Sequence, residues 1–375
     1  MARPTFQARQ VSPLVLSSNL IRNQVAEYMA SEFKLKALGW GPHFLQQLSL
    51  EEFEQCRPGR ILQQHKNQLQ VATEDGLIDL PMSSTMPAVV VGDWLLLDNE
   101  GRYLRLLDRF SLFSRKAAGT KVQTQLIAAN VDTAFVVTSI NQDFNLSRIE
   151  RYLTLVHEAG VEPVIVLTKA DLSANVDSSV EAIQSLDPML MVEAVNALAM
   201  DSVAKLLPWC GEGRTVLFLG SSGVGKSTLV NTLMGGTIQV TSGIREDDSK
   251  GRHTTTGRSL HPLPSGGLLL DTPGMRELQL ADVEDGLEKT FADISALAQS
   301  CRFTDCSHVS EPGCAILAAL ESGEIDDRRM ENYRKIMREQ QINSATLAEK
   351  RSRDKALGKF YRTVQSESRR RKTET

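Results

Sequence analysis

One octapeptide constrains the fold of this 375-residue chain more than any other segment: Gly-Ser-Ser-Gly-Val-Gly-Lys-Ser at residues 220–227. It follows the apolar run 215–219 and precedes a helical pattern, which is the context of a phosphate-binding loop. The glycines of such a loop let backbone N–H groups converge on phosphate oxygens, and its lysine reaches the β- and γ-phosphates. The residues predicted to hold the phosphates are Gly220, Ser221, Ser222, Gly223, Val224, Gly225, Lys226, Ser227 and Thr228.

The sequence around this loop shows a regular alternation. Between residues 130 and 275, apolar runs of strand length alternate with helical patterns at 146–159, 176–186, 200–206 and 226–234. This alternation predicts an α/β fold with a doubly wound parallel sheet. Ligands of such sheets bind at the carboxyl ends of the strands, so we expect a nucleotide at that edge.

Residues 168–171 are the segment predicted to recognise the nucleobase. They read Thr-Lys-Ala-Asp and lie at the end of an apolar run. A carboxylate such as that of Asp171 accepts from guanine N1–H and N2–H₂, whereas adenine offers no such pair of donors. Alone, the tetrapeptide also fits a turn at a strand end. Combined with the phosphate loop it predicts GTP. The residues predicted to bind the guanosine part are Thr168, Lys169, Asp171, Asn196 and Ala197.

Two segments downstream of the loop complete the expected GTP site. The run 267–271 ends in Asp271-Thr-Pro-Gly274, where Asp271 can hold Mg²⁺ through water and the Gly274 N–H can sense the γ-phosphate. The polar loop 252–256 supplies a second hydroxyl for the metal. The predicted magnesium ligands are Ser227, Thr255 and Asp271.

The residue that orients the attacking water is not the usual one. In Ras-like enzymes a Gln directly after the Asp-x-x-Gly motif does this, but here Met275 stands in that place. We therefore expect slow hydrolysis by the isolated chain, with Lys226 stabilising the transferred phosphate. His253 is the candidate that orients water. A loop histidine that contacts only solvent or RNA is the alternative.

The order of the motifs is reversed, because the base-reading segment 168–171 precedes the phosphate loop by about fifty residues. The site forms at the ends of strands wherever those strands fall in the sequence. Cutting such a domain at a surface loop and joining its old termini therefore preserves the site. The order predicts a circularly permuted GTPase.

A separate cluster follows in the pattern Cys-x4-Cys-x-His-x5-Cys. Cys301, Cys306, His308 and Cys314 lie within fourteen residues and make a full tetrahedral set, which indicates one structural Zn²⁺. A catalytic zinc would keep a position for water. A chance cluster of buried cysteines is the alternative.

The remaining segments suggest further domains. Short strands with turn signals before residue 120 predict a small β-barrel of the oligonucleotide-binding (OB) type, although a generic barrel fits the same pattern. Arg102, Arg105, Arg109, Arg115 and Lys116 add positive charge near its end, although a solvated face would look the same. Residues 350–372 carry ten Lys or Arg and are expected to bind RNA phosphates. The expected division is an extension (1–36), an OB-fold-like barrel (37–120), a permuted GTPase domain (121–282), a mostly helical zinc-binding domain (283–348) and a basic tail (349–375).

No run approaches 18 apolar residues, and the N-terminus lacks the apolar core of a secretory signal. Three of the five cysteines belong to the metal cluster, which does not favour disulfides. These features predict a cytoplasmic protein that does not enter membranes.

Together the motifs resemble the ribosome small-subunit-dependent GTPase A family. The resemblance rests on the permuted order, the preceding barrel, and the segments GSSGVGKSTLVN, GRHTTT, DTPGMRE and CRFTDCSHVSEPGC, and it covers about residues 57–365. It implies a monomeric bacterial factor that hydrolyses GTP when bound to the 30S ribosomal subunit and assists its late maturation. The implied partners are the 30S subunit, its 16S rRNA and other assembly factors.

Three features depart from the family pattern. Thr168 replaces the usual Asn, which is expected to loosen the link between base and phosphate sites, and Asn196-Ala197 replaces a Ser-Ala pair. Residues 38–55 are not a short basic leader. A permuted GTPase that acts on a different RNA or protein partner therefore stays open, as does a zinc- and RNA-binding module with a vestigial nucleotide site.

Overall fold

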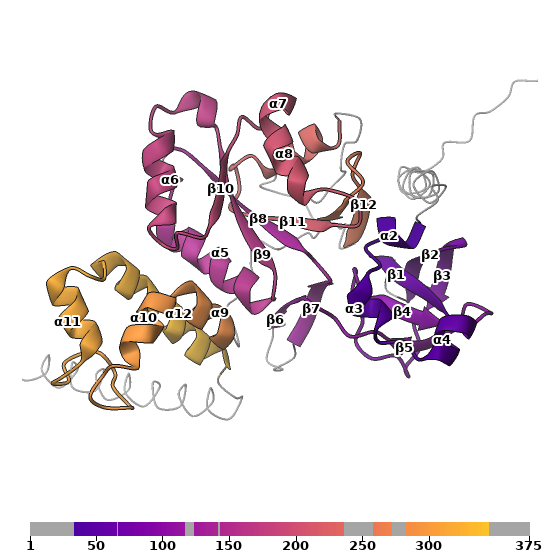
Figure 1. Ribbon diagram of the computed structural model, residues 1–375, viewed down its shortest axis with the longest axis horizontal. Helices are drawn as coiled ribbons and strands as arrows, with labels where there is room; N and C mark the ends of the chain where they lie inside the picture. Colours follow the sequence, from indigo (N-terminus) through magenta and orange to yellow (C-terminus); the bar gives the residue numbers. More distant parts are fainter. Residues whose placement is uncertain are drawn as a thin grey trace, which may run out of the picture. The chain divides into compact units, whose positions relative to one another are not determined.

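The computed structural model describes residues 34–344, except for residues 66 and 142 and the segments 117–123, 236–257 and 272–282 (Figure 1). Two compact units divide the chain. One consists of residues 1–113 and 126–277, and the other of residues 114–125 and 278–375. The predictions that lie outside the described residues are those for His253, Thr255, Gly274, Met275, residues 1–33 and the basic tail.

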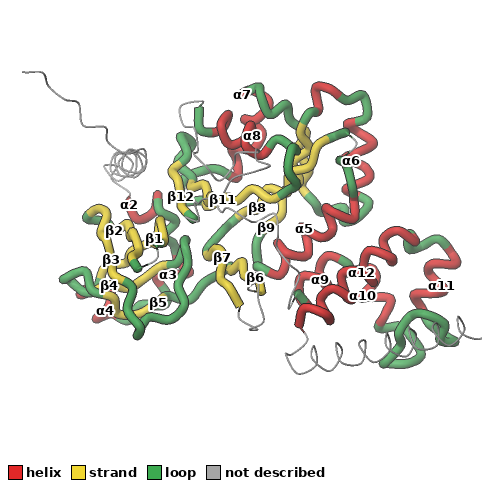
Figure 2. The backbone as a smooth tube through the Cα atoms, turned by 180° about the vertical axis from the view of Figure 1, so that it is seen from behind, coloured by secondary structure: helices red, strands yellow, loops and turns green. Residues whose placement is uncertain are grey.

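Six strands of the first unit form the sheet that carries the nucleotide motifs (Figure 2). Five of them run parallel, and the sixth, β12, is antiparallel beside β13. Their spatial order is β10 (Met191–Ala194), β9 (Glu162–Thr168), β8 (Thr133–Ser139), β11 (Thr215–Leu219), β13 (Leu268–Asp271) and β12 (Ser259–Pro262). The predicted parallel sheet is confirmed, and β12 is an antiparallel addition that the sequence analysis did not include.

The chain changes direction in this sheet between β8 and β11. From β8 it proceeds to β9 and β10 on one side, and from β11 it proceeds to β12 and then back to β13 on the other. Because crossovers between parallel strands are right-handed, the helices of the two sides cover opposite faces. Accordingly, α5 contacts β8 and β9, α6 contacts β10, and α7 packs on α8. The bounds are α5 (Leu146–Glu158), α6 (Val176–Gln184), α7 (Met200–Val203) and α8 (Lys226–Leu233).

The helix predicted at 200–206 is shorter than expected. Its α-helical part, α7, ends at Val203, and the chain continues as a 3₁₀ helix, Ala204–Trp209. Pro208 explains the change, because its ring has no N–H to donate and would clash with the carbonyl of residue 204 in an α-helix.

Alternate residues of the parallel strands form the core beneath α7 and α8. Phe135 and Val137 of β8 and Val164 and Val166 of β9 are buried there with Leu229 of α8. Side chains two residues apart point to the same face of a strand. This alternation fixes the register of each strand, and thereby the positions of the motifs at the strand ends.

Before this sheet, the described residues from 34 onward form three short helices and five antiparallel strands. The strands are the elements predicted as a barrel, and they pair in the order β3-β2-β1-β4-β5. β1 also pairs with β12 through Gln63 and Ser259, so both sheets belong to one continuous set of ladders. The bounds are α2 (Lys34–Ala37), α3 (Pro42–Leu45), α4 (Leu50–Gln55), β1 (Arg57–Gln64), β2 (Gln68–Thr73), β3 (Gly76–Pro81), β4 (Trp94–Leu97) and β5 (Tyr103–Leu106).

Residues 37–56, which the sequence analysis grouped with the barrel strands, are mainly helical. Pro42 starts α3 at a position where its missing N–H costs nothing. Ser49 and Glu52 cap α4 reciprocally, each side chain accepting from the backbone N–H of the other residue. The Ser-x-x-Glu spacing of this capping box was present in the sequence as a helix signal.

The buried side chain of Arg60 joins these helices, the barrel and the start of the larger sheet. Its guanidinium donates to the backbone carbonyls of Leu38, Gly92 and Asn130. Burial lowers the pKa of Arg60 to about 10, so it remains charged at neutral pH. Three segments distant in sequence are thus held by one side chain.

The second unit is mostly helical, as predicted. Its described helices are α9 (Glu284–Thr290), α10 (Ala292–Ala298), α11 (Ala315–Ser322) and α12 (Asp327–Ser344). Arg329 of α12 forms a two-pronged ion pair with Asp293 of α10 and lies over the ring of Phe291. A separate two-stranded sheet consists of β6 (Leu112–Lys116) and β7 (Thr124–Ala129). Among the described residues, no helix has the length and apolar character needed to span a bilayer.

Candidate nucleotide and metal sites

The described nucleotide motifs all lie at the carboxyl ends of the parallel strands. Thr168 ends β9 and residues 169–171 follow it, Asn196 follows β10, the phosphate loop follows β11, and Asp271 ends β13. Since these strands are parallel neighbours, their ends share one edge of the sheet. The reversal of chain direction between β8 and β11 marks the place where such sheets bind ligands.

Glycine is required at particular points of the phosphate loop. Gly220 has φ 145°, and a Cβ there would lie 2.3 Å from the Val137 carbonyl oxygen of β8. Gly225 has φ 97° and caps the N-terminus of α8 in the left-handed region. The loop therefore passes tightly over β8 and turns its backbone into a helix whose positive end favours phosphate.

Lys226 is held within the loop that it is predicted to serve. Its Nζ donates a hydrogen bond to the backbone carbonyl of Ser221, five residues earlier. The side chain is partly buried and bends back over the loop. The ammonium group therefore lies at the loop that is predicted to bind the phosphates.

The base-reading segment is bonded directly to the phosphate loop. The buried hydroxyl of Thr168 donates to the Val224 carbonyl at 2.5 Å, and Lys169 Nζ donates to the Gly223 carbonyl at 3.2 Å. Lys169 has φ 60°, which turns the chain sharply after β9. A loosened connection was expected from Thr in place of Asn, but the threonine hydroxyl retains a bond between the two segments.

Asp171 and the Asn196-Ala197 segment lie on adjoining turns. Asp171 is exposed on a 3₁₀ turn, whose first residue, Ala170, donates to the Val195 carbonyl at 3.4 Å. This bond sets the end of β9 beside residue 196, as the prediction of a shared guanine site requires.

Two hydroxyls that the sequence analysis missed hold the Asn196-Ala197 segment. Ser202 accepts from the Asn196 N–H at 2.8 Å, and Thr232 of α8 donates to the Ala197 carbonyl at 2.7 Å. Neither residue belongs to a recognisable motif, because a hydroxyl on a helix has no spacing signature.

The surroundings of Asp271 raise the pKa of its carboxyl group. Asp271 stands opposite Ser259 at the end of β13, and burial raises its pKa to about 6. A buried carboxylate is stabilised in its ionised form by a nearby cation. Asp271 therefore fits the predicted role of binding Mg²⁺, which accompanies GTP in GTPases.

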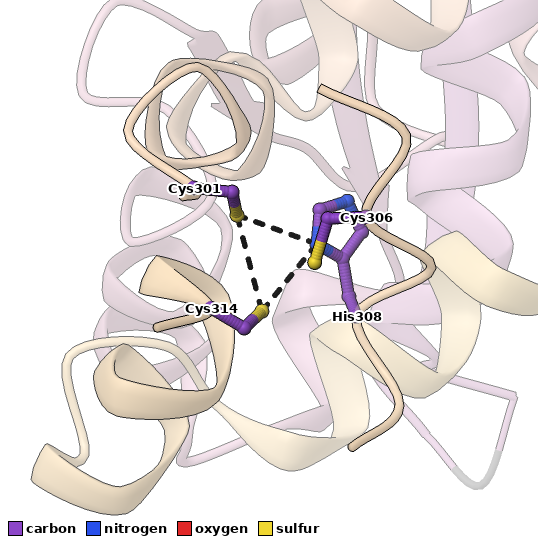
Figure 3. A group of neighbouring side chains, drawn as sticks. All are labelled: Cys301, Cys306, His308 and Cys314. Carbon is purple, nitrogen blue, oxygen red and sulfur yellow. Dashed lines mark hydrogen bonds between the residues drawn. The ribbon is translucent and has the colours of Figure 1, made fainter. Parts of the chain in front are cut away.

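The four residues of the cysteine cluster converge in the second unit (Figure 3). Their ligand atoms all lie within 4.8 Å of one another. Cys301 Sγ is 3.9 Å from Cys314 Sγ and 3.6 Å from His308 Nδ1, and Cys314 Sγ is 3.5 Å from His308 Nδ1. With Zn–S near 2.3 Å and Zn–N near 2.0–2.1 Å, tetrahedral geometry gives edges of about 3.8 Å for S–S and about 3.6 Å for S–N. The arrangement fits a tetrahedral metal.

The loop between these ligands is organised by Glu311, which the sequence analysis did not single out. Its carboxylate accepts from the hydroxyl and N–H of Ser307 and from the N–H groups of Val309 and Ser310. These bonds, the Ser307 hydroxyl first, hold the pKa of Glu311 well below its usual range. The Glu311 carboxylate therefore shapes the loop from which His308 projects.

Two other features fit metal binding. Cys314 caps the N-terminus of α11, where its Sγ accepts from the Leu317 N–H at 3.4 Å. Burial lowers the pKa of His308, which favours the neutral imidazole that binds metals. The residues of this cluster can thus hold a metal ion.

A doubly wound sheet in which the base-reading strand precedes the phosphate-loop strand defines the class of circularly permuted GTPases. Two solved structures support this class. YjeQ from Thermotoga maritima matches with a TM-score of 0.58 and 27% identity, over 76% of this chain and 98% of that one. YloQ, described as a circularly permuted GTPase, matches with a TM-score of 0.56 and 25% identity, over 78% of this chain and 97% of that one.

Sequence comparisons identify the family within this class. The model of the RsgA GTPase family matches residues 106–281. The "small ribosomal subunit biogenesis GTPase RsgA 2" of Vibrio parahaemolyticus is 57% identical over 90% of this chain and 94% of its own length. The RsgA of Mesorhizobium japonicum is 45% identical over 84% of this chain and 92% of its own length. The chain belongs to the RsgA GTPase family, whose members hydrolyse GTP.

Proposed function

We propose that this chain hydrolyses GTP on the small ribosomal subunit and assists the late maturation of that subunit. The names of its relatives support the biological role. The observation that carries the chemical role is the pair of hydrogen bonds from Thr168 and Lys169 to the phosphate loop. Through them the base and the phosphates of one nucleotide are recognised by connected segments.

We assign the guanosine contacts to the turns after β9 and β10. Asp171 would accept from the two guanine donors, the Lys169 stem would lie along the base, and the Asn196-Ala197 segment would support its edge. The phosphates would be bound by residues 220–228. When bound, Mg²⁺ would neutralise phosphate charge, held by Ser227, Thr255 and Asp271, while the Gly274 N–H would contact the γ-phosphate.

For hydrolysis we assign separate roles to Lys226 and His253. Lys226 would stabilise the charge that develops on the transferred phosphate. His253 would orient the attacking water, because Met275 has no group that can do so. Replacing His253 by Ala should preserve GTP binding and subunit binding but remove most of the stimulated rate. A stimulated rate within about twofold of wild type would transfer this role to a group of the ribosome.

The metal in the second unit would be one structural Zn²⁺, because Cys301, Cys306, His308 and Cys314 fill all four positions of a tetrahedron. Such a site leaves no position for a substrate. We keep residues 37–120, 121–282 and 283–348 as the proposed barrel, GTPase and zinc domains.

We further propose a monomer that acts in the cytoplasm, contacts 16S rRNA and helps other assembly factors leave the subunit. The basic tail supports an RNA contact, since ten Lys or Arg fall within residues 350–372. Membranes are not expected as partners.

The decisive experiment compares GTP turnover by the purified chain with and without purified 30S subunits. A slow basal rate and a large stimulation by the subunits are expected. Turnover that does not respond to subunits would favour the alternative, a permuted GTPase with a different RNA or protein partner. No turnover and no GDP binding would contradict the enzymatic role itself.

A further inference from the structure

The outer side of α4 presents two large apolar side chains to solvent. Leu50 is 81% exposed and Phe53 is 63% exposed. They are three residues apart and therefore neighbours on the helix surface. Glu51 and Glu54 are also exposed. We call Leu50, Glu51, Phe53 and Glu54 the α4 face.

This helix is fixed on the barrel by its opposite side. Glu52 Oε1 accepts from Arg105 Nε at 2.7 Å, and Arg105 also donates to the Gln47 carbonyl. The pKa of Glu52 is lowered to about 2, first by Arg105. Figure 1 shows α4 beside β5, which carries Arg105. Leu50 and Phe53 are therefore held in place pointing away from the barrel, and a partner would not need to order them.

The charge around this face does not suit a nucleic acid. Residues 34–113 contain ten Asp or Glu and eight Lys or Arg. Three of the five residues predicted to add positive charge are paired with carboxylates: Arg102 with Asp98, Arg105 with Glu52 and Arg109 with Asp93. The other two, Arg115 and Lys116, lie on β6, outside the barrel strands. Phosphate binding depends on unneutralised Lys and Arg, so this acidic apolar face would repel an RNA backbone.

We propose that the α4 face binds a basic protein segment that carries apolar side chains, exposed on the small ribosomal subunit. Apolar groups of the partner would pack on Leu50 and Phe53, and its Lys or Arg would pair with Glu51 and Glu54. The inference depends on the proposed function, because the subunit supplies the partner.

The test uses the full chain and a double variant, Leu50→Ser with Phe53→Ser. Binding is measured to intact 30S subunits, to the RNA-free protein fraction extracted from them, and to protein-free 16S rRNA. The variant should bind the protein fraction at least about tenfold more weakly, bind intact subunits more weakly, and bind 16S rRNA unchanged. Glu51→Lys with Glu54→Lys should act in the same direction.

The matched control is Met189→Ser, which removes a side chain that is 84% exposed elsewhere on the surface. It should bind like wild type, and equal GDP binding shows that each variant is folded. Unchanged binding of the double variant to the protein fraction would overturn the inference. A loss of binding to 16S rRNA alone would also overturn it. So would a wild-type dimer that the double variant disrupts. A wild-type chain that binds no subunits would instead contradict the proposed function.

Discussion

The nucleotide site and the zinc cluster differ in how far their residues are separated along the chain. The four cluster residues fall between Cys301 and Cys314, and one loop brings them together. The described nucleotide residues extend from Thr168 to Asp271 and meet only because parallel strands end at one edge. We expect the cluster to depend on a metal that fixes a local loop, and the nucleotide site to depend on a complete sheet. This difference predicts how each site will respond to substitution of its residues.

The largest effect is expected from removal of a cluster residue. Structural zinc contributes about 10–16 kcal/mol of apparent binding free energy in zinc-finger peptides, so Cys306→Ser should unfold the cluster loop. Metal analysis should show loss of Zn²⁺, and limited proteolysis should cut between residues 290 and 330. GDP binding should remain within about twofold of wild type, since the nucleotide residues are held by the sheet. Unchanged protease resistance without metal would refute the structural role.

A smaller but selective effect is expected at Asp171. Replacement by Ala removes a charged acceptor of two guanine donors and should weaken GDP binding by roughly 100-fold. Binding of ADP, which lacks these donors, should stay weak and unchanged. Titration of labelled GDP and ADP measures both, with Asp177→Ala as a control at another exposed acid. Comparable affinities of the wild type for ADP and GDP would contradict guanine selection.

An intermediate effect is expected at Glu311, because its carboxylate supports the cluster loop without being a metal ligand. Glu311→Gln should speed zinc loss to a chelator by roughly 10- to 100-fold. The pKa of Glu311 lies below its ordinary value of 4.5, so its contribution is present above that pH and lost as the pH falls through the lowered pKa. The effect should therefore be equal at about pH 6 and about pH 8. Glu321→Gln on α11 is the control, and equal rates for both variants would exclude the loop role.

The smallest effect is expected at Thr168. Thr168→Val keeps the shape of the side chain but removes the hydrogen bond to Val224, which should weaken GDP binding by roughly 5- to 20-fold. Thr168→Ser retains the hydroxyl and should bind nearly like wild type. If Val and Ser variants bind GDP equally, the hydroxyl does not connect the two segments.

Local signals predicted much of the fold and the residues of the metal cluster. The strand–loop–helix context of residues 215–234 and the alternation of apolar runs were sufficient to predict a parallel sheet, because periodicity reports which face of an element is buried. The ligand spacing predicted the metal cluster for a similar reason: all its geometry lies within one short loop. Element ends were less well predicted, as the change from α7 to a 3₁₀ helix shows.

The sequence by itself was enough to propose the chemistry of this protein: a loop for binding phosphates, a carboxylate for selecting guanine, and four residues with the spacing of metal ligands. Only the tertiary structure decided how these parts are joined. The bond from Thr168 to Val224, the pairing of Gln63 with Ser259, and the buried contacts of Arg60 connect residues that are far apart in the chain. No local pattern encodes such contacts, because each depends on which strands become neighbours, and that is settled by burial over the whole sheet.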